Sequence, residues 1–186
     1  MKNLKSNIRK DYLEKRNKLK EDEILNLSNI ICEKILNTNS YEQADSIFTY
    51  INMGSEVQTI NIINKSINDK KIIAVPLIIG KHNMVFIKIN SFDGLVKNKL
   101  GIYEPVFDKN KIVDSNDKSL IIVPGVVFAE NGYRIGYGGG YYDKYLSENV
   151  YMKAIGAAYN IQIAKSVPID DYDIKLDCIV TEKEIF

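Results

Sequence analysis

A glycine-rich segment that also contains an arginine and an aspartate is the part of this sequence best suited to chemistry. Five of the eleven glycines lie between Gly132 and Gly140, and Arg134 stands among them. Glycines let backbone N–H groups turn toward a bound anion, and a guanidinium can bind phosphate through two hydrogen bonds. Asp143 follows closely, and a carboxylate beside a phosphate site is a ligand that Mg²⁺ favours. The segment therefore predicts a phosphate site with a hard cation.

The segment matches neither of the two common phosphate-binding motifs. A G-x-G-x-x-G motif starting at Gly136 would need glycine where Tyr141 stands, and the pair Gly80-Lys81 is followed by His82 rather than serine or threonine. A tight structural turn is the alternative interpretation of the glycines. The combination of glycines with arginine, tyrosines and aspartate favours phosphate binding.

The elements on either side of the segment must position it. Residues 120–123 form a short apolar, β-branched run that ends at Pro124-Gly125, which predicts a buried strand followed by a turn. Residues 141–148 are predicted to form a helix. The N-terminus of that helix would add free N–H groups and a partial positive charge. We therefore expect the order strand, glycine-rich loop, helix.

Composition excludes several classes of protein. The chain has 186 residues, of which 45% are hydrophobic. Its 25 basic and 24 acidic side chains nearly balance, so the composition lacks the basic excess that is typical of nucleic-acid-binding proteins. Cys32 and Cys178 form no C-x-x-C motif, and we expect two small buried side chains rather than a zinc site or a disulfide. No apolar run approaches about 18 residues and no signal-peptide pattern opens the chain, so we expect a cytoplasmic protein that binds no membrane.

Strands and helices are predicted to alternate along the chain. Helical apolar spacing predicts helices over residues 4–19, 21–37 and 59–67, and apolar β-branched runs predict strands over residues 46–51, 71–76, 84–89, 120–123, 153–159 and 178–180. The stripe Leu4, Ile8 and Tyr12, and the stripe Ile60, Ile63 and Ile67, are expected to face the core. Residues 37–40 are predicted to be a turn, and residues 106–118 a surface loop. The pattern predicts a single α/β domain over residues 1–186, with three layers and a largely parallel central sheet.

Other charged residues have plain structural interpretations. Lys5 and Arg9 share one helix face, which could be a solvated basic face. Glu56 precedes a predicted helix, where a carboxylate offsets the helix dipole. The run Asp170, Asp171 and Asp173 could be a solvated turn. His82 is the only histidine and is predicted to be a surface loop residue, which makes a Ser-His-Asp triad improbable.

One family shares these patterns. The sequences Pro-Gly-Val-Val-Phe (124–128) and Asn-Gly-Tyr-Arg-Ile-Gly-Tyr-Gly-Gly-Gly-Tyr-Tyr-Asp (131–143) resemble the signature of the 5-formyltetrahydrofolate cyclo-ligases. Further similarities occur in the same order as in that family: Lys5 with Arg9; Tyr50, Glu56 and Thr59; the Gly-Ile-Tyr-Glu-Pro run at 101–105; and Asp173 with Asp177. Within the run at 101–105, Glu104-Pro105 is expected to have a structural role, because proline favours an extended conformation of the residue before it. Tyr172 stands where many members have histidine.

The resemblance implies an ATP- and Mg²⁺-dependent conversion of 5-formyltetrahydrofolate to 5,10-methenyltetrahydrofolate, with release of ADP and phosphate through a phosphorylated formyl intermediate. It implies catalytic roles for Arg134 and Lys5, and Mg²⁺ ligation by Asp143 and Asp173. It implies ATP binding by Lys5, Ser6, Asn7, Ile8, Arg9, Arg134, Ile135, Gly136, Tyr137, Gly138, Gly139, Gly140, Tyr141 and Tyr142. It implies folate binding by Arg9, Ile51, Glu56, Tyr137, Gly138, Gly139, Gly140 and Tyr141.

Two other functions are also compatible with a phosphate-binding glycine loop. A sugar-phosphate isomerase or transferase would bind a substrate phosphate there and need neither ATP nor Mg²⁺. A non-catalytic folate or nucleotide binder would not convert its ligand to a product. Folate-dependent ATP hydrolysis distinguishes the cyclo-ligase from both. We expect a monomer whose partners are small molecules and not nucleic acid.

Overall fold

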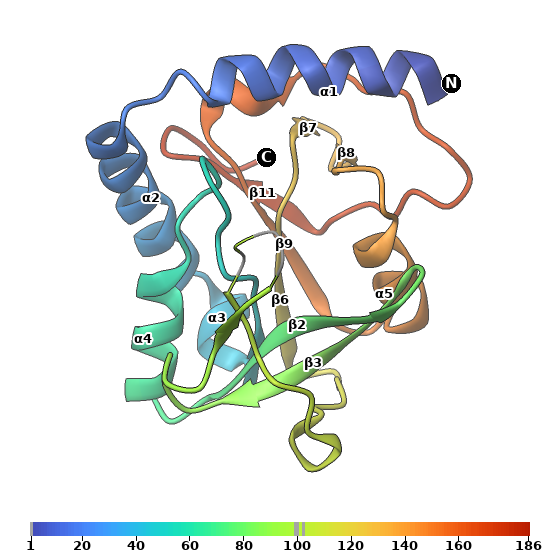
Figure 1. The fold of residues 1–186 in the computed structure, drawn as a ribbon. Coiled ribbons are helices and arrows are strands. Elements are labelled where there is room, and N and C mark those ends of the chain that lie inside the picture. Colours follow the sequence, from blue (N-terminus) through green and yellow to red (C-terminus); the bar gives the residue numbers. More distant parts are fainter. Residues whose placement is uncertain (1, 99–100, 102) are drawn as a thin grey trace.

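A six-stranded sheet forms the centre of the computed structural model, which describes residues 2–98, 101 and 103–186 (Figure 1). The strand order is β11-β9-β6-β1-β2-β3. The strands are β1 (Ser46–Phe48), β2 (Ile72–Gly80), β3 (Asn83–Ile89), β6 (Ser119–Val123), β9 (Lys153–Ala157) and β11 (Cys178–Val180). Every neighbouring pair is parallel except β2 and β3, which form an antiparallel hairpin at one edge. The predicted α/β class with a largely parallel sheet is confirmed.

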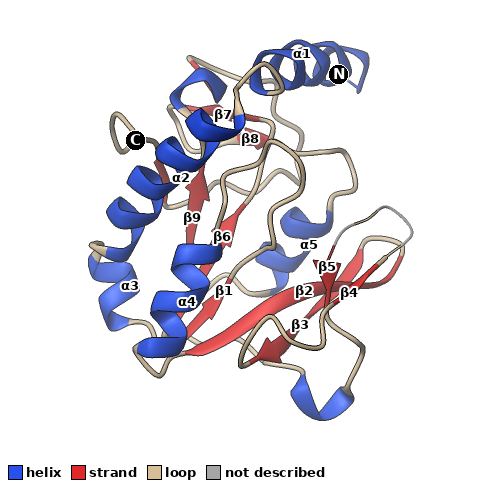
Figure 2. Ribbon diagram, turned by 60° about the vertical axis from the view of Figure 1, so that its left-hand side comes forward, coloured by secondary structure: helices blue, strands red, loops and turns tan. Residues whose placement is uncertain are grey.

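Helices cover both faces of this sheet (Figure 2). They are α1 (Lys2–Arg16), α2 (Glu21–Leu36), α3 (Asn39–Gln43), α4 (Ile60–Asn68) and α5 (Tyr141–Glu148). The helices α2, α3 and α4 pack on one face, and α5 packs on the other. The remaining helix, α1, crosses the top of the molecule in Figure 1 and contacts neither face of the main sheet through its apolar residues.

The strand sequences explain the three layers. Successive side chains of a strand point to opposite faces, so Ile47 packs in the core under α2 and α4, while Phe48 packs in the core under α5. The same alternation separates Ile122 from Ile121 in β6, which is buried along its whole length. Strands buried on both faces need a continuous apolar run, which is what the sequence of β6 provides.

A second, small sheet combines two strands from the segment between β6 and α5 with one strand that follows β9. It consists of β7 (Val127–Ala129), β8 (Arg134–Ile135) and β10 (Ile163–Ala164), and α1 packs on it through Ile8, Tyr12 and Leu13. The prediction of one loop from the end of β6 to α5 is therefore wrong. The run from Val126 to Ala129 is apolar and fully buried, and it pairs as a strand because burial requires its backbone groups to be hydrogen-bonded.

Several element boundaries differ from the sequence prediction. The first helix ends at Arg16 rather than at residue 19, and Leu4 is 54% exposed, since α1 packs on the small sheet through Ile8, Tyr12 and Leu13 instead. Ile60 is 44% exposed, since Ile62 and Ile63 face the core instead. The predicted turn at 37–40 is partly a helix, because the Thr38 side chain caps α3 by accepting a hydrogen bond from the Tyr41 N–H.

The predicted surface loop at 106–118 contains one short 3-10 helix, Lys109–Lys111, and the small strands β4 (Val96–Lys97) and β5 (Tyr103–Glu104) precede it. Ile102, in the predicted 101–105 motif, lies outside the described residues. The Glu104 carboxylate accepts a hydrogen bond from the Asn98 side chain. Both cysteines are free, Cys32 buried and Cys178 half-buried. No helix in the described part of the chain is long and apolar enough to cross a membrane.

Candidate active site

A cavity of about 1330 Å³ opens where several strands of the main sheet end. Its wall combines α1, the residues after β1 and β6, the β2–β3 hairpin, the glycine-rich loop with the start of α5, and the loop at 170–174. Parallel strands place their carboxyl ends at one edge of a sheet, and ligands of such folds bind there. The cavity is larger than the 300–1,000 Å³ typical of a site for a single small molecule.

The glycine-rich loop, Gly136–Gly140, forms one side of the cavity and runs directly into α5. Gly138 and Gly140 have φ of +100° and +67°, a left-handed conformation that costs glycine little, and Gly140 is the N-cap of α5. The Arg9 Nε donates a hydrogen bond of 2.7 Å to the Gly136 carbonyl. A β-carbon at Gly138 would lie 3.4 Å from the Arg9 guanidinium, so the loop and α1 are closely packed at this point.

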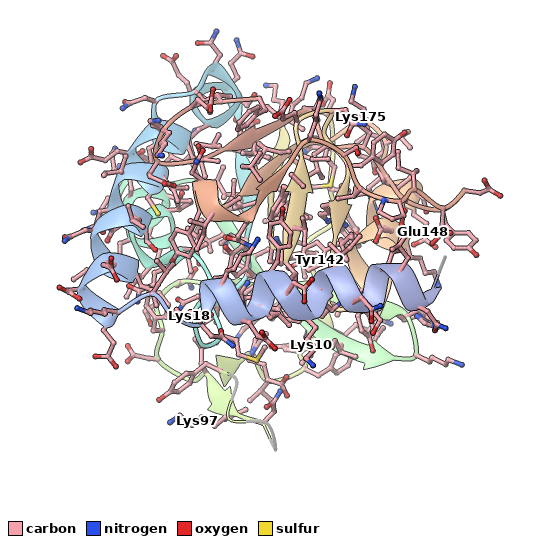
Figure 3. All side chains as sticks on the ribbon, turned by 90° about the horizontal axis from the view of Figure 1, so that it is seen from above. Lys10, Lys18, Lys97, Tyr142, Glu148 and Lys175 are labelled. Atoms are coloured by element: carbon pink, nitrogen blue, oxygen red, sulfur yellow. The ribbon has the colours of Figure 1, made fainter. Side chains whose placement is uncertain are left out.

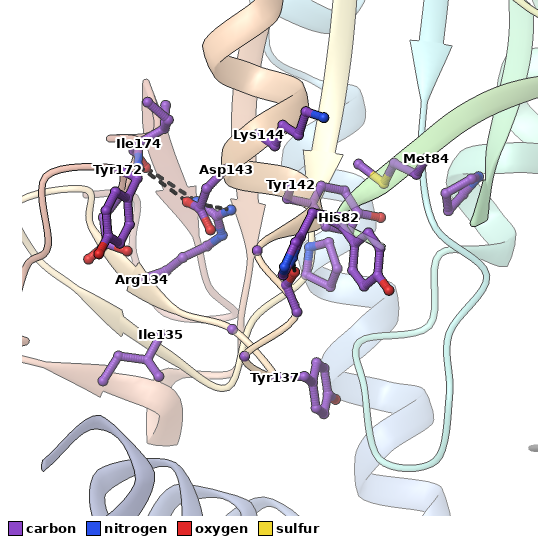
Figure 4. Close-up of a pocket in the computed structure, with 18 of the residues that line it drawn as sticks. His82, Met84, Arg134, Ile135, Tyr137, Tyr142, Asp143, Lys144, Tyr172 and Ile174 are labelled. Carbon is purple, nitrogen blue, oxygen red and sulfur yellow. Dashed lines mark hydrogen bonds and ion pairs between the residues drawn. The ribbon is translucent and has the colours of Figure 1, made fainter. Parts of the chain in front are cut away.

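Arg134 and Asp143 form an ion pair inside the cavity (Figure 4). Arg134 Nη2 lies 3.1 Å from Asp143 Oδ1, and the Arg134 side chain is almost fully buried. Arg134 also donates to the Ile174 carbonyl, and the Ile174 N–H donates to Asp143 Oδ1, both at 3.2 Å. Burial lowers the pKa of Arg134, while the nearby Asp143 acts to raise it. The result is a desolvated cation, held between β8, α5 and the acidic loop by an ion pair and a hydrogen bond.

A second group of charges lies on the wall of the same cavity. Lys5 Nζ forms an ion pair of 2.8 Å with Asp170 and a second one with Asp173. The Asp170 N–H donates a 2.7 Å hydrogen bond to Asp173 Oδ2, which orients the two carboxylates. Burial acts to lower the pKa of Lys5, but the two carboxylates outweigh burial and raise it above its usual value. Lys5 therefore stays charged in this site.

The two predicted metal ligands, Asp143 and Asp173, line the same cavity and are each paired with a cation of the chain. Among the described residues, no group of three or more histidine, cysteine or acidic side chains could hold a metal ion. Mg²⁺ is commonly held by only one or two carboxylates together with phosphate oxygens. The donor set therefore fits Mg²⁺ that arrives with a nucleotide, and does not fit a metal held by protein alone.

The structure brings some of the other predicted site residues together and separates others. Lys5, Ser6 and Arg9 line the cavity, but Asn7 does not and Ile8 packs against the small sheet. A helix turns neighbouring side chains to different faces, so a continuous segment of α1 cannot all reach one ligand. From the tyrosine set, Tyr137 and Tyr141 line the cavity.

Tyr142 also borders the cavity and is half-buried, with its hydroxyl buried in the protein. Its hydroxyl has no hydrogen-bond partner among the described residues. Burial raises the pKa of Tyr142 well above its usual value. This side chain therefore remains neutral, and its hydroxyl is the one buried side-chain polar atom that the described residues leave unpaired.

Glu56 lies behind the cavity wall rather than on it. Ile51 lines the cavity, whereas Glu56 is 6% exposed and accepts a 2.8 Å hydrogen bond from the Met53 N–H. Burial raises the pKa of Glu56, and Met53, Tyr137 and the charge of Arg16 oppose that rise. Of these groups, Tyr137 is on the cavity wall and adjoins the Glu56 carboxylate.

Two residues at this site were not predicted to belong to it. His82 is exposed in the β2–β3 hairpin loop, as predicted, but its Nδ1 lies 2.6 Å from the Gly139 carbonyl. Since a carbonyl only accepts, Nδ1 carries the proton in this contact. Arg16 is 3% exposed and contacts the loops on both sides of the cavity. The sequence signal that could have identified Arg16 is its position seven residues after Arg9. This spacing is about two helical turns, so the two side chains leave the helix on about the same side.

The sequence of this chain is similar to those of known proteins. The model of the 5-formyltetrahydrofolate cyclo-ligase family matches residues 1–182. A probable 5-formyltetrahydrofolate cyclo-ligase of Schizosaccharomyces pombe is 32% identical over 180 residues, covering 88% of each chain. The 5-formyltetrahydrofolate cyclo-ligase of Escherichia coli K12 is 27% identical over 147 residues, covering 77% of this chain and 81% of the relative.

Two solved structures of 5,10-methenyltetrahydrofolate synthetases have a fold similar to that of this chain. The NMR structure of Aquifex aeolicus 5,10-methenyltetrahydrofolate synthetase superimposes with a TM-score of 0.84 at 32% identity, covering 98% of this chain and 91% of that chain. A 5,10-methenyltetrahydrofolate synthetase from Mycoplasma pneumoniae gives a TM-score of 0.73 at 25% identity, covering 96% and 98%. The fold, the cavity-lining glycine loop and the match over nearly the whole sequence lead to one conclusion, that this chain is an enzyme of the 5-formyltetrahydrofolate cyclo-ligase family.

Proposed function

We propose that the protein converts 5-formyltetrahydrofolate to 5,10-methenyltetrahydrofolate, using ATP with Mg²⁺ and releasing ADP and phosphate through a phosphorylated formyl intermediate. One observation carries the proposal. Lys5, Arg9 and Arg134 reach the wall of a single cavity that also contains the glycine-rich loop and the carboxylates of Asp143 and Asp173. Cations, backbone N–H groups and Mg²⁺ ligands are the parts that phosphoryl transfer requires.

The proposed chemistry proceeds in two steps. The formyl oxygen attacks the γ-phosphorus of ATP and ADP leaves, which converts a poor leaving group into phosphate. The N10 nitrogen of the folate then attacks the formyl carbon, loses its proton, and phosphate departs. Such transfers depend on positioning and charge neutralisation rather than on a nucleophile from the protein. The absence of a histidine base beside a serine or cysteine, with His82 the only histidine, agrees with direct transfer.

The proposed role of each charged residue follows from its position in the cavity. Arg134, desolvated between β8 and α5, is proposed to stabilise the charge of the transferring phosphoryl group, because electrostatic interactions strengthen where water is excluded. Lys5 is proposed to stabilise the same charge from another part of the cavity wall, and Arg9 to hold phosphate beside the Gly136 carbonyl. Asp143 and Asp173 would hold Mg²⁺, which neutralises phosphate charge when bound.

The folate is proposed to bind beside Ile51, Tyr137 and Tyr141, where flat aromatic surface and the glycine loop meet. Glu56 supports this part of the site from behind Tyr137. The cavity volume of about 1330 Å³ supports a site for two substrates rather than one. We also propose that residues 1–186 act as a single domain, and that the protein is a cytoplasmic monomer with small-molecule partners.

The test measures formation of the methenyl chromophore by absorbance, with 5-formyltetrahydrofolate, ATP and Mg²⁺ omitted one at a time. A rise that needs all three components, with one phosphate released per chromophore formed, is the expected result. Folded protein that gives no rise would exclude the proposed reaction. Sugar phosphates would then be the next compounds to try.

A further inference from the structure

One arginine connects the loops on the two sides of the cavity. Arg16 is the last residue of α1, and its side chain is 3% exposed. It follows Lys5 by eleven positions and Arg9 by seven, close to three and two helical turns, so all three side chains leave α1 on about the same side. Lys5 and Arg9 reach the cavity, whereas Arg16 is buried beyond it.

The Arg16 guanidinium donates to three different parts of the chain. Nη2 donates to the Tyr137 hydroxyl at 2.7 Å, Nε donates to Ser55 Oγ at 3.0 Å, and Nη1 donates to the Gly125 carbonyl at 3.2 Å. Tyr137 belongs to the glycine-rich loop, Ser55 to the loop after β1, and Gly125 to the turn after β6. A planar guanidinium has five N–H donors in a fixed arrangement, so these acceptors are held at set positions relative to one another.

The contact with Tyr137 extends to a buried carboxylate. The Tyr137 hydroxyl accepts from Arg16, so its own proton is available for the neighbouring Glu56 carboxylate, with which Tyr137 forms a hydrogen bond. Glu56 follows Ser55, the other side-chain acceptor of Arg16. The guanidinium therefore holds Tyr137 of the glycine loop, which bonds Glu56, and also holds Ser55, the residue before Glu56 in the loop after β1.

We propose that Arg16 is a positioning residue that couples the nucleotide half of the cavity to the folate half, by holding Tyr137 and the Ser55–Glu56 loop in one hydrogen-bonded relay. The inference rests on the proposed function, which assigns the backbone N–H groups of the glycine loop to ATP phosphate and the side of the cavity formed by Ile51 and Tyr137, with Glu56 behind it, to folate. Binding of either substrate orders its own loop, and through Arg16 it also orders the loop used by the other. A second ligand then pays less ordering entropy, which is positive coupling between the two sites.

The charge of Arg16 has a second consequence, at Glu56. The titratable groups that interact with this carboxylate are Arg16 from α1, Tyr50 after β1, Tyr137 in the glycine loop, Tyr142 in α5 and Tyr159 after β9. Arg16 is the cation in this set, and the others are neutral phenols. Removing the guanidinium charge leaves burial to dominate, so the pKa of Glu56 is expected to rise further.

The experiment measures binding by calorimetry. The dissociation constant of 5-formyltetrahydrofolate is determined with and without a non-hydrolysable ATP analogue and Mg²⁺, for the wild type, Arg16→Met and Arg16→Lys. The matched control is Lys10→Met, since Lys10 lies on the exposed side of the same helix, which Figure 3 views from above. Each variant is first shown to be folded by circular dichroism and urea unfolding.

We expect the nucleotide analogue to tighten folate binding by about 5-fold or more in the wild type, within the usual range of such coupling. The coupling is the ratio of the folate dissociation constants measured without and with the nucleotide analogue. Lys10→Met should show the wild-type ratio, Arg16→Lys should keep part of it, and Arg16→Met should bring it close to 1. The pH midpoint of folate binding should move upward in Arg16→Met and return toward the wild-type value in Arg16→Lys, which keeps the charge. A purely structural role would not produce that return.

If Arg16→Met does not fold, Tyr137→Phe tests the relay, because it removes only the hydroxyl, and coupling should fall in the same way. Unchanged coupling in folded Arg16→Met, or an equal loss in Lys10→Met, would overturn the inference. A wild type that binds both ligands without coupling would overturn it and leave the proposed function standing. A wild type that binds neither ligand would overturn both.

Discussion

The Arg134 guanidinium lies 3.1 Å from the Asp143 carboxylate, and Lys5 is paired in the same way with Asp173. Two of the proposed phosphate-binding cations, Arg134 and Lys5, are thus each paired with a proposed Mg²⁺ ligand, whereas Arg9 donates to the Gly136 carbonyl. A buried charge is costly unless it is paired, so the two ion pairs stabilise these side chains in the cavity wall. In the proposed reaction, ATP would supply phosphate oxygens to the cations, and Mg²⁺ would bind the carboxylates.

Arg134→Ala is expected to reduce kcat about 10²- to 10³-fold, since it removes a preorganised charge from a site that excludes water. Arg134→Lys should restore little of the rate, because an ammonium cannot reproduce the planar hydrogen-bonding pattern to Asp143 and the Ile174 carbonyl. Steady-state kinetics measures both. Lys118→Ala, a change at an exposed ion pair, is the control for general effects of losing a charge. Full turnover in folded Arg134→Ala would contradict the assignment.

Asp173→Asn is expected to raise the Mg²⁺ concentration needed for nucleotide binding by about 10-fold or more, because an amide is a weaker ligand for Mg²⁺ than a carboxylate. Asp171→Asn is the matched control, since Asp171 is exposed in the same loop and forms no part of the Lys5 contacts. Titrating Mg²⁺ against a fixed concentration of fluorescent ATP analogue measures the difference. Equal Mg²⁺ requirements in the two variants would remove Asp173 from the metal site.

Gly138→Ala is expected to weaken both folding and nucleotide binding. Its φ of +100° strains any residue with a β-carbon, at a cost of about 1–2 kcal/mol, and the new methyl group would lie 3.4 Å from Arg9. Gly136→Ala is the matched control for stability, because its φ is ordinary and no atom lies within 4 Å of the added carbon. Urea unfolding should show a loss for Gly138→Ala and a change within about 0.5 kcal/mol for Gly136→Ala. Similar losses in both variants would show that backbone conformation is not the cause.

Glu56→Gln is expected to change how stability depends on pH. Burial raises the pKa of Glu56 above 4.5, so the folded state binds its proton more tightly than the unfolded state does. Wild-type stability should therefore fall relative to that of Glu56→Gln as the pH rises above about 4.5, up to the raised pKa, and stay constant relative to it at lower pH.

Urea unfolding of the two proteins at a series of pH values measures this difference. Glu148→Gln, which removes an exposed carboxylate on α5, is the control for the loss of one negative charge. A gap between wild type and Glu56→Gln that does not vary with pH would show that Glu56 is not a desolvated carboxylate. Folate binding should weaken in Glu56→Gln if the carboxylate supports that half of the cavity.

The elements with a strong apolar pattern were predictable from sequence. The strand β6 and the helix α2 lie within one residue of where the pattern placed them, because a fully buried strand and an amphipathic helix each have a distinct spacing of apolar residues. The short elements were not predictable. The strands β7 and β8 and the helix α3 have few residues, and tertiary pairing or a single cap determines whether they form.

The sequence by itself determined the chemical parts of this site: the glycines, Arg134, and the two aspartates at positions whose spacing resembles that of the family. Only the tertiary structure decided which of the predicted residues reach the cavity, because burial depends on packing between segments far apart in the chain. Packing turned Asn7 and Ile8 away from the cavity and placed Glu56 behind Tyr137. It also buried Arg16 between three loops, since a long side chain at the end of a helix reaches whatever the rest of the fold brings beside it.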